Sequence, residues 1–274
     1  MNFFDIFSKK QPATPTTSQT DNDPQPQTEQ PHAEEPQSTP TPAPADGKAH
    51  IYNLIIIDES GSMGHLRNAT LSGVNETINT IRQAQKDYAD TQTHFLTLVT
   101  FDSPGPRGIA VRTLIAAKPI GEVQDFDDYE PNGCTPLYDA MGQSISRLHQ
   151  LIKEDADASA IVTVMTDGLE NASREYNGRQ LKALIEQLKE EGWTFNYMGS
   201  AHDVQSVCDL LSIENVIEFT HDEQGTEETW RCESNSKRRF FARMSQDWEG
   251  LKECSSDEKR EYRKRSSKNF FVDE

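Results

Sequence analysis

The sequence has little that would tie it to a membrane or to nucleic acid. No stretch of the 274-residue chain approaches the roughly 20 consecutive apolar residues needed to cross a bilayer. Its 45 acidic and 27 basic side chains give a formal net charge of −18, whereas nucleic acids and anionic membranes attract positive surfaces. The composition therefore argues against a membrane span and against a general affinity for nucleic acid.

Cysteine is also scarce, and a secretory signal is not apparent. The opening residues, MNFFDIFSKK, contain only a short apolar run, which Asp5 interrupts and lysines follow rather than precede. A zinc site or a dense disulfide framework would need closely spaced cysteines, but the four present are far apart and form no C-x-x-C pair. We expect reduced thiols in a cytoplasmic protein, at Cys134, Cys208, Cys232 and Cys254.

Only 34% of the residues are hydrophobic, which suits a folded core with solvated ends better than a uniformly folded chain. Residues 11–46 are rich in Pro, Thr, Gln and acid, and bury too little to offset their ordering entropy. We expect residues 1–48 to be disordered, with an apolar tip that is either a docking motif, a weak membrane-surface anchor or a frayed terminus. That tip consists of Phe3, Phe4, Ile6 and Phe7.

From residue 49 to residue 220, β-rich apolar runs alternate with helical patterns. Such alternation predicts a mostly parallel sheet with helices on both faces. The short connection DSPGPRG instead predicts an antiparallel pair with an edge strand. The expected strands are IYNLIIID, HFLTLVTF, IAVRTLI, AIVTVMTD, TFNYMGS and NVIEF, and the expected helices lie near residues 71–81, 137–152, 181–188 and 204–211.

Residues 221–274 form a charged C-terminal extension in which one amphipathic helix is expected. Phe240, Met244, Trp248 and Leu251 fall at helical spacing. This helix either docks on the parent domain, which we favour, or binds a partner.

Two strands end in aspartates, which poses a chemical question. The run IIID ends at Asp58 and AIVTVMTD ends at Asp167, although an unpaired buried carboxylate is costly. Because ligands of open parallel sheets bind beyond the carboxyl ends of the strands, both side chains can reach one crevice. Ser60, Ser62 and Thr135 add hydroxyls there, Thr135 from a loop entering a helix at Pro136. Five oxygen donors without nitrogen or sulfur suit Mg²⁺ first, then Mn²⁺ or Ca²⁺.

At these residues the sequence resembles the von Willebrand factor type A (vWA) family. Its metal-ion-dependent adhesion site (MIDAS) reads D-x-S-x-S, then a threonine, then an aspartate. The resemblance covers roughly residues 50–220, with the motifs in the expected order between the expected strands. The match consists of Asp58, Ser60 and Ser62 in DESGS, Thr135 in GCTPLYDA and Asp167 in MTDGLEN.

The resemblance implies a doubly wound α/β sheet of six strands in the order 3-2-1-4-5-6. It implies that the hydroxyls touch the metal, that the aspartates often act through water, and that a coordination position remains for an acidic residue of a partner. An intracellular, bacterial-type member would commonly be an adaptor for ATPases, kinases, phosphatases or stress-response complexes. We therefore predict a non-enzymatic, metal-dependent adaptor that binds the Asp or Glu of a protein partner.

Two other functions stay open. An aspartyl phosphotransferase also places an aspartate at the end of the first strand, but the haloacid-dehalogenase pattern needs a second aspartate where this chain has Ser60. Neither a G-x-S-x-G elbow nor a G-x-x-x-x-G-K-[ST] phosphate loop is present. Alternatively, the metal is purely structural and partners bind the Phe-rich tip or the C-terminal helix.

Several polar residues near these motifs have an ordinary interpretation beside the functional one. Asp102 is either a carboxylate behind the metal ligands or a turn residue. Glu170 either borders the site or is a solvated loop acid, and we favour the second. The histidines at 65, 94, 149 and 202 show no cluster, so we expect them to lie at the surface or at helix ends.

Overall fold

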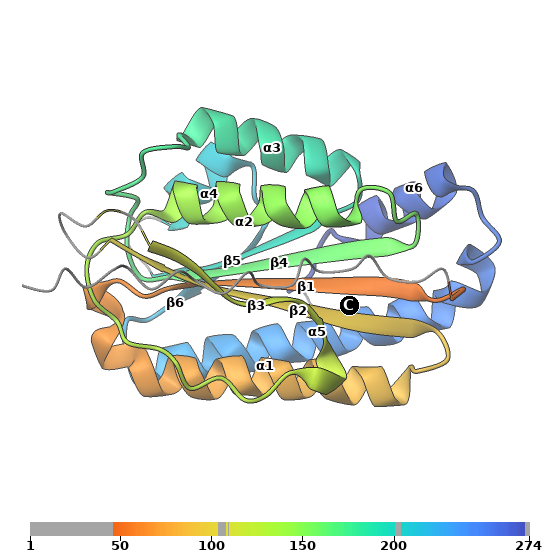
Figure 1. Cartoon of the computed structure of the whole chain (residues 1–274), viewed down its shortest axis with the longest axis horizontal. Coiled ribbons are helices and arrows are strands. Elements are labelled where there is room, and N and C mark those ends of the chain that lie inside the picture. Colours follow the sequence, from red (N-terminus) through yellow and green to blue (C-terminus); the bar gives the residue numbers. More distant parts are fainter. Residues whose placement is uncertain (1–45, 104–107, 109, 201–203, 272–274) are drawn as a thin grey trace, which may run out of the picture. The chain divides into compact units, whose positions relative to one another are not determined.

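Six strands form one sheet with helices on both faces (Figure 1). The structure is a computed structural model that describes residues 46–103, 108, 110–200 and 204–271, so most of the predicted disordered segment lies outside the described residues. The strand order is β3-β2-β1-β4-β5-β6, as predicted. The strands are β1 (Ala49–Asp58), β2 (Gln92–Asp102), β3 (Ala110–Pro119), β4 (Ala158–Thr166), β5 (Thr194–Ser200) and β6 (Asn215–Phe219).

All strand pairs are parallel except β2 with β3, which confirms the predicted antiparallel edge. Helices α1 and α5 lie on one face of the sheet, and α2, α3 and α4 lie on the other (Figure 1). The helices are α1 (Arg67–Asp87), α2 (Leu137–Ile152), α3 (Gly178–Glu190), α4 (Val204–Leu211), α5 (Glu223–Leu251) and α6 (Ser256–Ser266), with short 3₁₀ turns η1 (Gly61–Leu66) and η3 (Ile120–Glu122).

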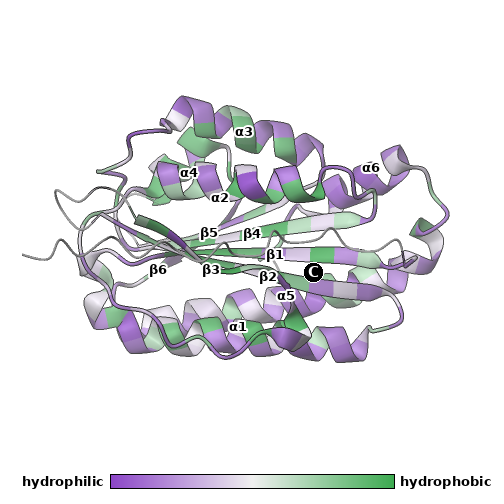
Figure 2. Cartoon of the chain, viewed as in Figure 1, coloured by the Kyte–Doolittle hydropathy of each residue, from purple (hydrophilic) through white to green (hydrophobic). Residues whose placement is uncertain are grey.

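Strand β1 is buried along its whole length because helices cover both of its sides. Ile55 and Ile57 belong to the core under α1 and α5, whereas Leu54 and Ile56 belong to the core under α2 to α4. Figure 2 shows apolar residues along the central strands and polar residues distributed over the helices. Burial on both faces explains why the sequence of this strand is a continuous apolar run rather than an alternating one.

Helix α5 packs against the sheet and along α1, so the segment after β6 contributes to the core. It begins at Glu223, well before the Phe240 at which the apolar spacing becomes visible in the sequence. Trp230 is completely buried against Gly73 of α1, where an added Cβ would lie 2.1 Å from the indole ring. The spacing of apolar residues in the sequence does not predict the first half of α5, because several of its buried residues are polar.

Those polar residues form a buried network between α5, α1 and β4. The Lys237 ammonium lies 2.5 Å from Glu233 Oε1 and donates to Thr163 Oγ1 at 3.1 Å. Thr163 and Thr77 each donate a hydroxyl to Glu233 at 3.0 Å. Both charged side chains are fully buried, so their pairing and hydrogen bonds have to offset the cost of removing two charges from water.

A search of the helices in the described part of the chain finds none with the length and apolar character of a membrane span.

We predict that Lys237→Met lowers the free energy of unfolding by about 3–5 kcal/mol, because it leaves the Glu233 carboxylate buried and unpaired. Lys252→Met is the matched control, since Lys252 pairs with Glu249 at the exposed end of the same helix. It should leave the stability close to that of wild type, because an exposed ion pair contributes little. Equal effects of the two substitutions in urea unfolding would contradict the buried network.

We also predict a pH-dependent contribution from His50, which is buried at the start of β1 between the carboxylates of Asp155 and Asp46. Burial alone lowers the pKa of His50, but its hydrogen bonds to the two carboxylates outweigh burial and raise the pKa above 6.5. A raised pKa stabilises the fold below the unfolded-state value, and this gain is lost as pH rises through the folded-state value. The melting-temperature difference between wild type and His50→Gln should therefore be larger at pH 6 than at pH 9. A constant difference would contradict this.

Candidate metal centre

Asp58 and Asp167 lie together because β1 and β4 are parallel neighbours that end at the same edge of the sheet. Asp58 is the last residue of β1 and is completely buried. One of its carboxylate oxygens accepts from the Ser60 backbone N–H at 2.7 Å, and the other accepts from Thr166 Oγ1 at 2.6 Å. Asp58 is thus held from both its own loop and the end of the neighbouring strand.

A chain of close polar contacts links the loop after β1 to the loop after β4. Ser60 Oγ lies 3.1 Å from Ser62 Oγ, and Ser62 Oγ donates to Asp167 Oδ1 at 2.7 Å. The Asp167 side chain is completely shielded from solvent, although Ser62 is exposed. The structure therefore brings Asp58, Ser60, Ser62 and Asp167 into one hydrogen-bonded set.

Thr135 joins this set from the loop before α2. If Gly168 carried a Cβ, that atom would lie 3.1 Å from Thr135 Oγ1 and 3.9 Å from Asp58 Oδ2, so the hydroxyl and the carboxylate flank the same glycine. Helix α2 begins at Leu137 with Pro136 as its N-cap, one residue later than predicted. No side chain caps this helix, so Thr135 is not the helix cap that its position before a proline would favour. All five predicted residues meet at one place.

The electrostatics of this site favour a bound cation. Burial raises the pKa of Asp58 to about 7; hydrogen bonds from Thr166 and Ser60 oppose the rise, and the charge of Asp167 adds to it. Two carboxylates held together away from water are stabilised by a cation between them. Within the described residues, no group of three or more His, Cys, Asp or Glu side chains is arranged to hold a metal. The carboxylate and hydroxyl oxygens of this site fit a hard divalent cation.

The loop after β4 is fastened to α2 by two carboxylates that sequence reasoning did not assign. Glu170 accepts hydrogen bonds from the backbone N–H groups of Tyr138, Ala172 and Ser173 and from the Ser173 hydroxyl. It is therefore a structural anchor, not a solvated loop acid. Buried Asp139 accepts from three successive backbone N–H groups, those of residues 174, 175 and 176.

A second clamp holds the loop after β1 from the other side. Glu59 is buried, receives two hydrogen bonds from the Arg112 guanidinium at 2.7 and 2.6 Å, and accepts from the Glu130 backbone N–H. Asp102, at the end of β2, lies near this pair. Burial raises the pKa of Asp102, the charge of Glu59 raises it further, and Arg112 lowers it. The charges that act on Asp102 are thus those of Glu59 and Arg112.

Two histidines lie beside the five oxygen donors, and the sequence analysis connected neither to the site. His221 Nε2 lies 2.5 Å from Asp167 Oδ2, and its ring meets the ring of His65 edge to face at 4.3 Å. His65 was expected to lie at the surface or at a helix end, outside any cluster, and there was no sequence-based prediction for His221. An imidazole nitrogen therefore lies in contact with one of the predicted oxygen donors. His221 reaches the site through the turn between β6 and α5. No local sequence pattern predicts that position.

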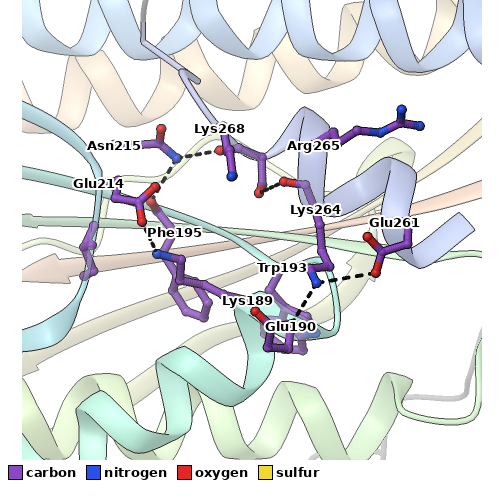
Figure 3. A pocket seen from close by; sticks show the side chains of 12 residues that line it. Lys189, Glu190, Trp193, Phe195, Glu214, Asn215, Glu261, Lys264, Arg265 and Lys268 are labelled. Carbon is purple, nitrogen blue, oxygen red and sulfur yellow. Dashed lines mark hydrogen bonds and ion pairs between the residues drawn. The ribbon is translucent and has the colours of Figure 1, made fainter. Parts of the chain in front are cut away.

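A separate cavity of about 420 Å³ lies at the start of β5 and β6, the opposite end of the sheet (Figure 3). Trp193 and Phe195 stack on one side of it. Lys189 and Lys264, which line it, are paired with Glu214 and Glu190. The cavity is remote from the oxygen donors and takes no part in the candidate site.

Solved structures with a similar fold include an adhesin and vWA domains. The pilus adhesin SpaC from Lactobacillus rhamnosus GG matches with a TM-score of 0.52 and 12% identity, over 75% of this chain and 32% of that one. A von Willebrand factor type A protein from Catenulispora acidiphila matches at 0.45 and 20% identity, over 69% and 43%. The SpRpn10 VWA domain matches at 0.45 and 12% identity, over 68% and 94%.

No protein-family model matches the sequence, and no curated protein matches it. The aligned region spans less than half of the length of several of the matching structures, including the adhesin. At these identities the likeness concerns the fold alone. The strand order and the match to the adhesin therefore show a doubly wound α/β fold with one antiparallel edge.

We predict that Asp139→Asn destabilises the protein by roughly 2–3 kcal/mol, because an amide oxygen cannot replace a carboxylate that accepts three backbone hydrogen bonds. Glu175→Gln is the control, since the exposed Glu175 side chain accepts only a side-chain amide, from Gln143. Urea unfolding measures both variants. Wild-type stability of Asp139→Asn would show that the loop after β4 is not held in this way.

Proposed function

We propose that this chain is a metal-dependent protein-interaction module of the vWA type. Asp58, Ser60, Ser62, Thr135 and Asp167 would hold one divalent cation, with Mg²⁺ or Mn²⁺ favoured over Ca²⁺. When bound, the cation supplies a positive charge at an otherwise acidic edge of the sheet. The observation that carries the proposal is the convergence of five oxygen-bearing side chains from three loops.

The charge balance of the site supports recognition of an acidic partner. The two aspartates together match the charge of one divalent cation, and the hydroxyls add no negative charge. A partner Asp or Glu could then approach despite the net charge of −18, because the attraction at close range outweighs the screened repulsion at long range. Leu169, which is 49% exposed and follows Asp167 by two residues, offers an apolar contact.

The proposed setting is a cytoplasmic adaptor, in which the partner is an ATPase, a kinase or a phosphatase. This setting rests on the vWA resemblance and on the scarcity of cysteine. The adhesin among the fold relatives is described as a pilus protein, so the fold itself is compatible with surface attachment as well. Identification of the partner would distinguish a cytoplasmic adaptor from a surface-attached protein.

The sequence leaves two alternative functions open. In an aspartyl phosphotransferase, Asp58 would be the nucleophile, but both of its oxygens accept hydrogen bonds and Ser60 stands where a second aspartate would act as acid. In a scaffold with a purely structural metal, partners would bind elsewhere. Turnover of para-nitrophenyl phosphate that disappears in Asp58→Asn would favour the phosphotransferase.

We predict that a protein captured by the full chain from an extract is released by EDTA and rebinds when Mg²⁺ or Mn²⁺ is restored. Thr135→Ala should weaken binding by about 1–3 kcal/mol, or roughly fivefold to 150-fold, because it removes one metal contact without adding charge. Pull-down followed by titration of the purified partner gives both quantities.

Thr113→Ala is the matched control, because Thr113 is a partly exposed residue of the edge strand β3 and lies outside the donor set. It should leave the affinity unchanged. A partner whose affinity is indifferent to both EDTA and Thr135→Ala would favour the scaffold alternative over the proposed one.

A further inference from the structure

The turn between β6 and α5 places an imidazole against the candidate metal centre. His221 Nε2 lies 2.5 Å from Asp167 Oδ2, while the other oxygen of the same carboxylate accepts from Ser62. His221 is 44% exposed, whereas the Asp167 side chain beneath it is completely shielded. We infer that His221 supplies a nitrogen donor to the metal held here, and that the centre therefore prefers Mn²⁺ or Zn²⁺ to Mg²⁺. This inference rests on the proposed metal site.

The spacing of the polar atoms supports shared ligation. Metal–oxygen and metal–nitrogen bonds of about 2.0–2.2 Å place neighbouring donors of one cation about 3 Å apart. The contacts from Ser60 to Ser62, from Ser62 to Asp167 and from Asp167 to His221 are 3.1, 2.7 and 2.5 Å. His221 thus lies at the end of the same series of polar contacts, through the second oxygen of Asp167.

Charge favours a neutral ligand at this point. Asp58 and Asp167 already match the charge of a divalent cation, so a further carboxylate from this chain would oppose the approach of the partner's Asp or Glu. A neutral imidazole adds a strong donor without adding charge. Imidazole nitrogen suits Mn²⁺ and especially Zn²⁺, whereas Mg²⁺ strongly prefers oxygen.

The turn that carries His221 is fixed by local contacts. Asp222 caps α5 by accepting from the Gly225 backbone N–H at 2.7 Å, and its own N–H donates to the Thr220 carbonyl. Gly225 permits this close fold, because an added Cβ would lie 2.2 Å from Thr220 Oγ1. The imidazole is therefore placed by the start of a 29-residue helix that is anchored in the core.

His65 acts as a positioning residue for His221. Its Nε2 lies 3.4 Å from the His221 carbonyl oxygen, and its ring packs edge to face against the His221 ring at 4.3 Å. It belongs to η1, directly after the serines that face the centre. His65 therefore couples the orientation of His221 to the loop that carries Ser60 and Ser62.

The test is calorimetric titration of MgCl₂, MnCl₂ and ZnCl₂ into the full chain, comparing wild type with His221→Gln. The variant should lower the Mn²⁺ and Zn²⁺ affinities by about tenfold or more while the Mg²⁺ affinity stays within a factor of about three. Mn²⁺ is the primary probe, since the exposed Cys134 thiol could itself bind Zn²⁺. His65→Gln should shift the Mn²⁺ affinity in the same direction by a smaller factor.

His149→Gln is the matched control, because His149 pairs with Glu191 and packs on Trp193, away from the oxygen donors. It should bind all three ions like wild type. Pulsed electron paramagnetic resonance of the wild-type Mn²⁺ complex adds a readout that does not depend on how a variant folds. It should show the coupling of a directly bonded imidazole nitrogen.

Three outcomes of these measurements distinguish the inference about His221 from the proposed metal site. Selective loss of Mn²⁺ affinity together with nitrogen coupling supports the inference. Mn²⁺ binding without nitrogen coupling, and with equal affinity in His221→Gln, overturns it and leaves the proposed metal site standing. No binding of any ion to wild type would overturn the proposed site and the inference together.

Discussion

The cost of holding two carboxylates together away from water is the constraint on which the rest of this site depends. Asp58 ends β1 and Asp167 directly follows β4, its parallel neighbour, so the strand order itself fixes their proximity. Repulsion between them adds to burial in raising the pKa of Asp58 to about 7. A ligand that removes the repulsion between the two carboxylates would therefore stabilise the fold. A divalent cation between them would do this by neutralising both charges.

Ion pairs and hydrogen bonds around the site hold its loops in place despite the repulsion between the two carboxylates. Glu59 with Arg112 fixes the loop after β1, while Asp139 and Glu170 fix the loop after β4 against α2. Helix α5, held in place by the buried pair of Glu233 and Lys237, fixes the turn that carries His221. Under the proposed function, a preorganised donor set of this kind would bind a metal without the cost of ordering its loops at the time of binding.

Strand positions and the placement of the five oxygen-bearing residues after strands were predictable from local patterns in the sequence, whereas the strand order followed from the resemblance to the vWA family. Apolar runs mark the strands, and D-x-S-x-S, the threonine and the aspartate follow strand ends. The roles of Asp139, Glu170 and His221 were not predictable, because their partners are backbone groups or side chains brought near only by the fold. The first half of α5 was hidden for a related reason: its buried face is partly polar, so helical spacing of apolar residues does not reveal it.

The most direct measurement of the central claim is anomalous X-ray scattering at the manganese edge from crystals of the full chain grown with MnCl₂. The account predicts one strong peak enclosed by Ser60, Ser62 and Thr135, with both aspartates within reach of it directly or through water. A fully occupied manganese position elsewhere on the chain, with no peak between β1 and β4, would contradict it.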